Sequence, residues 1–149
     1  METGKRTANR QNCRAVILTY SQPRFKDLIL SGEKIHTIRE DKKMRWRPGM
    51  GIQHWMHNPR NVKKNPHKFA DGECKTIQEV VISRNQDRVE PTVFIFIGYE
   101  HEGMFLSKAE VRQFAKNDGL TIEEFREFFV PETMPAFRGR IIHFTDKLY

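Results

Sequence analysis

The sequence predicts an α+β fold, a mixed and partly closed β-barrel with about three helices on its rim. Segments with the β-branched and aromatic composition of strands outnumber helical segments, and several of them follow one another directly. Helical periodicity is confined to three segments, one near the N-terminus and two near the C-terminus. A chain of 149 residues is long enough for one domain with a core of its own.

The first half of the chain begins with a buried strand and an amphipathic helix. Residues 15–20 form a continuous apolar run, which is typical of a strand. The helix that follows has Pro23 in its first turn and an apolar stripe, and Gly32 stands where a glycine often ends a helix. Strands are then predicted over residues 35–40 and 51–57, on either side of a Pro-Gly turn.

The second half begins with residues 58–72, whose proline, glycine and basic side chains predict a long loop. The remaining elements are two strands, two helices and a last strand, predicted over residues 74–83, 92–99, 107–119, 121–130 and 140–145. Both helices open with a capping box, and the last strand faces inward with either Ile141 or Ile142. The second helix carries three phenylalanines at helical spacing, which indicates core residues: Phe125, Phe128 and Phe129.

The chain is basic, with a formal net charge of +7 and a pI of about 9.6. A basic surface favours polyanionic partners such as RNA, although surplus lysine on a solvated surface gives the same balance. Residues 1–13 are predicted to be a disordered basic arm, followed by a single domain over residues 14–149. Eight basic residues are candidates for nucleic-acid contacts: Lys42, Lys43, Arg45, Arg47, Arg60, Lys63, Lys64 and Lys68.

Several functional classes are disfavoured by the sequence. Cys13 and Cys74 lack the spacing of metal ligands and are typical of unpaired thiols in a reducing compartment. No apolar run is long enough to span a bilayer, and the first residues do not have the pattern of a signal peptide. His54 and His57 face opposite ways in a strand, which disfavours a metal site. We therefore expect a cytoplasmic monomer that uses no metal and no other cofactor.

The segment Gly32-Glu33-Lys34-Ile35-His36-Thr37-Ile38-Arg39 resembles the GxKxxTxR signature of ASCH domains, which are small PUA-like β-barrels linked to RNA. The Pro-Gly turn that follows also fits the family, with Met50 in place of its aspartate. The two C-terminal helices and the last strand look like those of the small bacterial N4-acetylcytidine amidohydrolases. This likeness covers residues 15–146.

The resemblance implies a catalytic set, because that hydrolase subgroup uses a lysine, a threonine and a glutamate. The lysine and the threonine match Lys34 and Thr37, and the glutamate position falls on Asp118, which is one methylene shorter. In an enzyme of this kind, Thr37 would be the nucleophile, Lys34 the base and Asp118 a supporting carboxylate. Lys34 and Thr37 would face opposite sides of a regular strand, so Lys34 must lie in the turn after Gly32 for the two to meet.

The candidate substrate-binding residues are Gly32, Glu33, Arg39 and Trp46. Arg39 shares a strand face with Thr37, and its guanidinium can bind a phosphate or a carbonyl oxygen. Trp46 stands among basic residues, which is the composition of a platform for stacking unpaired bases. Packing of the Trp46 ring against the core is the alternative.

Three functions are open at this stage. The first is binding of RNA or a nucleotide in a groove around Lys34, Thr37 and Arg39. The second is amide hydrolysis that removes the acyl group from N4-acetylcytidine-like nucleosides. The third is a regulatory, protein-interaction role of the basic loop. Each of these residues also has a purely structural interpretation: a solvated lysine at Lys34, a β-prone threonine at Thr37, and an arginine at Arg39 that pairs with Glu40 or Asp41 at the surface.

Overall fold

The computed structural model describes residues 15–98 and 102–149, and it confirms the predicted α+β class. Within these ranges the chain forms eight strands, three α-helices and one short 3-10 helix. The arm predicted for residues 1–13 lies outside the described residues, as do Cys13 and the end of the predicted strand at Tyr99.

The strands divide between two sheets. In chain order, the elements are β1 (Val16–Tyr20), α1 (Pro23–Ser31), β2 (His36–Arg39), β3 (Gly51–Met56), the 3-10 helix η1 (Val62–Lys64), β4 (His67–Glu73), β5 (Thr76–Ser83), β6 (Thr92–Phe96), β7 (Gly103–Phe105), α2 (Lys108–Asn117), α3 (Ile122–Phe129) and β8 (Ala136–His143). One sheet has the order β1-β3-β4 with β1 and β3 parallel, and the other has the antiparallel order β2-β8-β5-β6-β7. No closed barrel is found in the described part of the chain.

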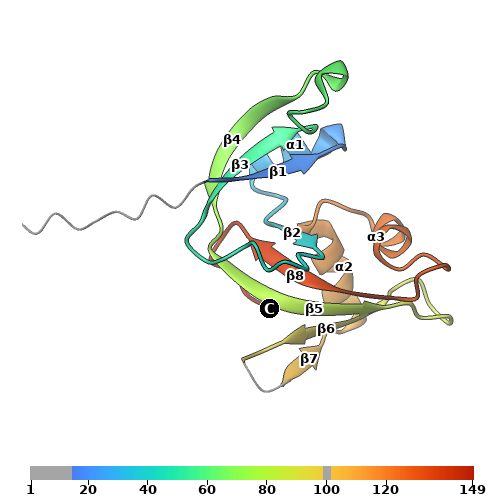
Figure 1. Cartoon of the computed structure of the whole chain (residues 1–149). Coiled ribbons are helices and arrows are strands. Elements are labelled where there is room, and N and C mark those ends of the chain that lie inside the picture. The colour runs from blue at the N-terminus through green and yellow to red at the C-terminus, as the bar shows by residue number, and fades with distance from the viewer. Residues whose placement is uncertain (1–14, 99–101) are drawn as a thin grey trace, which may run out of the picture.

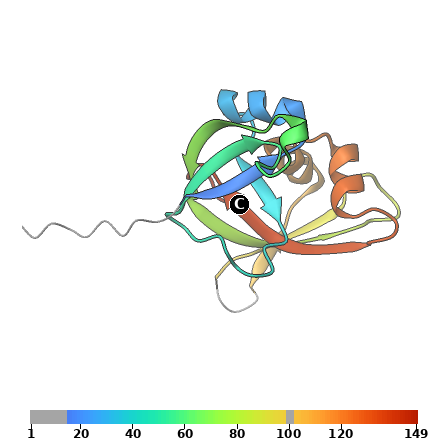
Figure 2. The same ribbon diagram turned by 45° about the horizontal axis from the view of Figure 1, so that its top comes forward.

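Helices cover both sheets (Figure 1). The chain passes from one sheet to the other between β1 and β2, between β2 and β3, and where β4 leads into β5. Helix α1 lies over the three-stranded sheet (Figure 2). Helices α2 and α3 pack against the five-stranded sheet, where Phe114 and Phe125 are completely buried. The C-terminal half of strand β8 is buried on both faces, and Ile141 belongs to this core while Ile142 belongs to the core beneath the three-stranded sheet.

Three differences from the predicted elements share one physical cause. The loop predicted over residues 58–72 is wrong in its second half, because His67–Glu73 pair with β3 as β4. The sequence did not predict β7, and β8 begins at Ala136 instead of Arg140. Each of these segments is extended because it pairs with a neighbouring strand, and sequence composition alone does not reveal that pairing.

The turn between α1 and β2 determines where the signature residues lie. Gly32 ends α1 with a φ of 80°, a left-handed conformation that costs glycine little. The N–H of Ile35 then donates to the carbonyl oxygen of Asn117 at 2.9 Å, which holds this turn against the end of α2. As predicted, Lys34 precedes the strand while Thr37 lies within it.

Candidate binding site

Four residues that the sequence singled out, Lys34, Thr37, Arg39 and Asp118, line one cavity of about 180 Å³. Its other walls come from α1, β1, β2 and the region of α3, and their apolar members are Tyr20, Phe25, Ile38, Leu120, Phe128 and Phe129. Apolar walls around a few convergent polar groups are typical of a site for a small ligand or for one part of a larger one.

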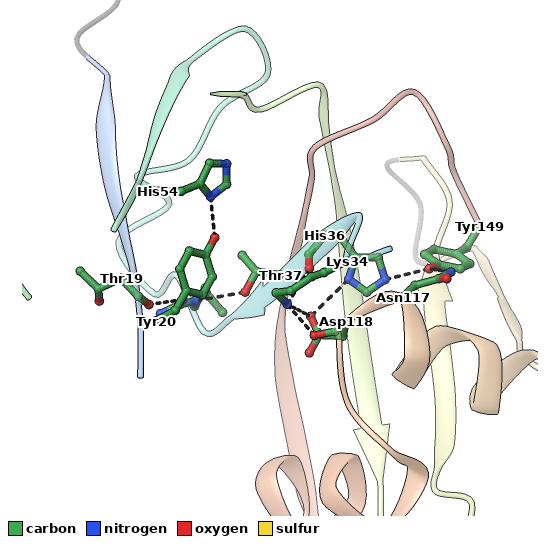
Figure 3. Close-up of polar contacts among 10 residues, drawn as sticks. Thr19, Tyr20, Lys34, His36, Thr37, His54, Asn117, Asp118 and Tyr149 are labelled. Carbon is green, nitrogen blue, oxygen red and sulfur yellow. Dashed lines mark hydrogen bonds and ion pairs between the residues drawn. The ribbon is translucent and has the colours of Figure 1, made fainter. Parts of the chain in front are cut away.

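The polar part of the cavity is built on a buried ion pair between Lys34 and Asp118. The Nζ of Lys34 donates to Oδ1 of Asp118 at 3.0 Å, and to the backbone oxygens of Asp118 at 2.6 Å and His36 at 2.9 Å (Figure 3). The two side chains are only 1% and 6% exposed. Three acceptors around one nitrogen match the three N–H donors of an ammonium, so this geometry fits charged Lys34.

Burial and charge act against each other on this pair. Burial lowers the pKa of Lys34 below 10.5, and the Asp118 carboxylate opposes that shift. Burial also acts to raise the pKa of Asp118, but the Lys34 ammonium and the His36 ring lower it below 3.8. The ammonium lies at the C-terminal end of α2, where the helix dipole favours a cation. We therefore infer an ammonium–carboxylate pair at neutral pH.

Asp118 reaches this position because it is the C-terminal cap residue of α2. The next residue, Gly119, has a φ of 83° and lies under close contacts. A Cβ atom there would lie 3.0 Å from Cε1 of Phe25 and 3.2 Å from Cδ of Lys34. Only glycine therefore allows α1 and the Lys34 side chain to pack this closely on the turn that carries Asp118.

Arg39 is held at the other side of the cavity by the backbone of β1. Its Nη2 donates to the carbonyl oxygen of Thr19 at 2.8 Å, and its Nε lies 3.4 Å from Oγ1 of Thr37. The guanidinium also lies 5.6 Å from the centre of the Tyr20 ring, a distance that suits a cation–π contact. Of the two surface partners considered for Arg39, Asp41 binds Arg140 at 2.5 Å and Glu40 pairs with Lys42 at 3.2 Å.

Two more open grooves adjoin the cavity, and Thr19 and Arg39 border all three hollows. The first groove follows the loop after β2 and is lined by three of the predicted nucleic-acid-binding residues, Lys42, Lys43 and Arg45. The second groove lies toward the loop after β3 and includes His57, Asn58, Asn61 and Lys64. Cationic side chains thus extend from Arg39 in two directions.

Other predicted site residues lie elsewhere. Neither the cavity nor the two grooves are lined by the basic residues Arg47, Arg60, Lys63 and Lys68. Lys68 instead forms an exposed ion pair with Asp71 at 3.2 Å. Gly32 and Glu33 are exposed but do not line the cavity, so their contribution is the turn that places Lys34.

Of the two alternatives for Trp46, the stacking platform is wrong and packing against the core is what the structure shows, because this side chain is 5% exposed and packs beneath the three-stranded sheet, where it also borders the first groove. Asp41 draws the loop inward by accepting hydrogen bonds from the backbone N–H groups of Arg45 at 2.8 Å and Trp46 at 3.2 Å. The expectation that Phe128 is a core residue is also wrong, since it is 71% exposed and lines the cavity. Helical spacing did not separate Phe128 from its buried neighbours.

Comparison with models of protein families, with curated proteins and with solved structures gave no match for this chain. Across residues 15–98 and 102–149, no helix has the length and apolar character needed to cross a membrane. The same residues contain no group of three or more His, Cys, Asp or Glu side chains that could hold a metal ion.

Proposed function

We propose that this protein is an ASCH-type, PUA-like domain that binds RNA or a nucleotide around Lys34, Thr37 and Arg39. The observation that carries this proposal is the position of Arg39. This residue borders the cavity and also both grooves, each of which is lined by further cationic side chains. A guanidinium at that junction binds a phosphate while the attached base enters the cavity.

The size of the cavity supports a ligand that enters only in part. Its volume of about 180 Å³ is smaller than the roughly 300–1,000 Å³ of pockets that enclose a drug-sized ligand. One flat ring therefore occupies the cavity, and the rest of the ligand continues into the grooves. A nucleobase with its sugar and phosphate has this division between a flat ring and an anionic chain.

The chemistry of the cavity wall suits a base. Phe128 offers an exposed aromatic face at the cavity, and stacking on aromatic side chains is the usual way proteins hold unpaired bases. The Asp118 carboxylate accepts a hydrogen bond from an exocyclic amino group, as carboxylates do from cytosine. The Thr37 hydroxyl both donates and accepts, so it suits either edge of a ring.

This proposal predicts that Arg39→Ala weakens binding of a short single-stranded RNA by roughly 10-fold to 100-fold, because hydrogen bonds between charged groups are lost. The slope of log affinity against log salt should fall by about 0.7 for each phosphate contact removed. Fluorescence anisotropy with a labelled oligonucleotide over a salt series measures both quantities.

The matched control is Arg138→Ala, which removes an exposed arginine that does not line the cavity or the adjoining grooves. It should leave the affinity and the salt slope close to those of the unmodified protein. Equal losses in both variants would indicate general charge attraction and would contradict a specific role for Arg39.

A second candidate function is hydrolysis of an acylated cytidine, and the specific observation in its favour is that Lys34 and the Thr37 hydroxyl share the cavity. The Thr37 oxygen would attack the acyl carbonyl while Lys34 takes its proton. The tetrahedral intermediate would then break its C–N bond to give acyl-threonine, as Lys34 returns the proton to the departing cytidine amine. Water would then release the acid. This function ranks second because Lys34, surrounded by three acceptors, must first lose a proton.

Incubation with N4-acetylcytidine tests the second candidate. If the protein is a hydrolase, the release of cytidine should be abolished in Thr37→Ala and should persist in Thr37→Ser, which keeps the hydroxyl. Equal turnover in the unmodified protein and in Thr37→Ala would exclude Thr37 as the nucleophile. Absence of turnover in the unmodified protein would leave RNA or nucleotide binding as the function of the site.

A further inference from the structure

Behind the Lys34–Asp118 pair, a line of polar side chains runs from the buried His36 ring to Gln113, which is exposed. The Nε2 of His36 lies 2.7 Å from the hydroxyl oxygen of Tyr149, which accepts from Nδ2 of Asn117 at 2.8 Å. The Nε2 of Gln113 donates in turn to Oδ1 of Asn117 at 2.8 Å. Figure 3 shows Asp118 between Lys34 and His36, with Tyr149 on the far side of the imidazole ring.

The Asp118 carboxylate at one end favours one direction for these hydrogen bonds, and the Asn117 amide is oriented to match it. Because the Tyr149 hydroxyl accepts from Asn117, its own proton points to Nε2 of His36. Burial raises the pKa of Tyr149 to about 12, so this hydroxyl keeps its proton at neutral pH. Burial also lowers the pKa of His36, and a neutral ring that accepts at Nε2 must carry its proton on Nδ1.

The Nδ1 of His36 faces Asp118. It lies 3.4 Å from Oδ1 of that carboxylate, and within the described part of the chain it makes no well-aligned hydrogen bond. The contact is therefore a long electrostatic one between an N–H dipole and an anion. If the side-chain amides of Gln113 and Asn117 were both turned over, every hydrogen bond of the line would reverse its direction. An unprotonated Nδ1 of His36 would then face the Asp118 carboxylate, and the negative charge of Asp118 disfavours that arrangement.

We propose that His36 and Tyr149 are positioning residues that hold the Asp118 carboxylate, and through it the Lys34 ammonium, at the wall of the cavity. Neither of them lines that cavity, so they act on a ligand only through Asp118. The tyrosine fixes the proton of His36 on Nδ1, and the polarised N–H then holds the carboxylate from behind. Only the effect on ligand binding rests on the proposed function.

The tautomer of His36 gives a test that needs no ligand. NMR of the histidine ring nitrogens should show His36 with its proton on Nδ1 in the unmodified protein, and a shift of proton population to Nε2 in Tyr149→Phe. This variant removes one hydroxyl and keeps the ring. A proton on Nε2 in the unmodified protein, or an unchanged tautomer in Tyr149→Phe, would overturn the proposal.

A pair of substitutions at His36 separates positioning from packing. The amide of His36→Asn can replace the Nδ1 donor toward Asp118, whereas the amide of His36→Gln reaches toward Tyr149 and leaves Asp118 without a donor. RNA affinity should fall by about tenfold in His36→Gln and by much less in His36→Asn. Equal losses in both variants would mean that His36 only fills space. If the unmodified protein binds no RNA, the proposed function fails while the tautomer result still decides this proposal.

Discussion

Replacing Asp118 with alanine is expected to lower the free energy of unfolding by about 3–5 kcal/mol, the usual cost of removing one partner of a buried ion pair. The Lys34 ammonium would keep two backbone acceptors but would lose its counter-charge in a place where its side chain is 1% exposed. Urea unfolding monitored by circular dichroism measures the change.

Two further variants make this result interpretable. Asp71→Ala removes a carboxylate from an exposed ion pair with Lys68 and should cost less than about 1 kcal/mol. Combining Lys34→Met with Asp118→Leu replaces both charges by apolar groups and should recover most of the stability. A loss below about 1 kcal/mol in Asp118→Ala would contradict the charged state inferred for Lys34.

Acidification from pH 7 is expected to destabilise the protein strongly, because buried histidines, among them His54 and His143, resist protonation in the folded state. Burial lowers the pKa of His54 from 6.5 to about 4, with the Lys34 charge adding to the shift, and lowers that of His143 to about 3. The unfolded chain takes up these protons below about pH 6.5 while the folded protein does not. Stability is therefore full above pH 6.5 and falls until the folded-state pKa is reached.

The size of this effect follows from the shifts. At about 1.4 kcal/mol per pKa unit, His54 alone contributes on the order of 3 kcal/mol. The contributions of the two histidines together fall within the roughly 5–15 kcal/mol that stabilises a typical domain. Unfolding free energies measured with urea at several pH values give the number of protons taken up on unfolding, as the slope of free energy against pH. This number should be smaller by about one in His54→Asn, whose amide can still accept a hydrogen bond from Tyr20. His67→Asn at an exposed position serves as the control, and equal slopes in the two variants would contradict the prediction.

The sequence predicts the elements that have a strong local signal. Both capping boxes form as predicted, with Ser107 and Thr121 accepting from the backbone three residues later, and Gly32 ends α1. Strand β4 could not be found in this way, because its glycine, histidine and acidic residues do not favour strands and its conformation depends on pairing with β3. The division of the strands into two sheets likewise depends on long-range contacts.

The candidate site shows the same contrast. The sequence placed Lys34 in the turn before the strand and selected Thr37, Arg39 and Asp118, which share the cavity. It gave no sign that His36 backs Asp118, because a histidine in a strand has no pattern that marks its partners. It also left the exposure of Trp46 open and placed Phe128 in the core, since the burial of Trp46 is decided by how the loop after β2 folds inward around Asp41.

Strand β8 carries one consequence for how the fold is specified. Its adjacent isoleucines, Ile141 and Ile142, serve two different cores, so a slip of one residue in the strand register would still bury an isoleucine on each side. Polar contacts remove this ambiguity. Arg140 binds Asp41 at 2.5 Å, and Nε2 of His143 lies 3.0 Å from the Gln78 side-chain oxygen. The alignment that sets Thr37 opposite Ile142 is therefore fixed by charged and amide groups that never touch the cavity.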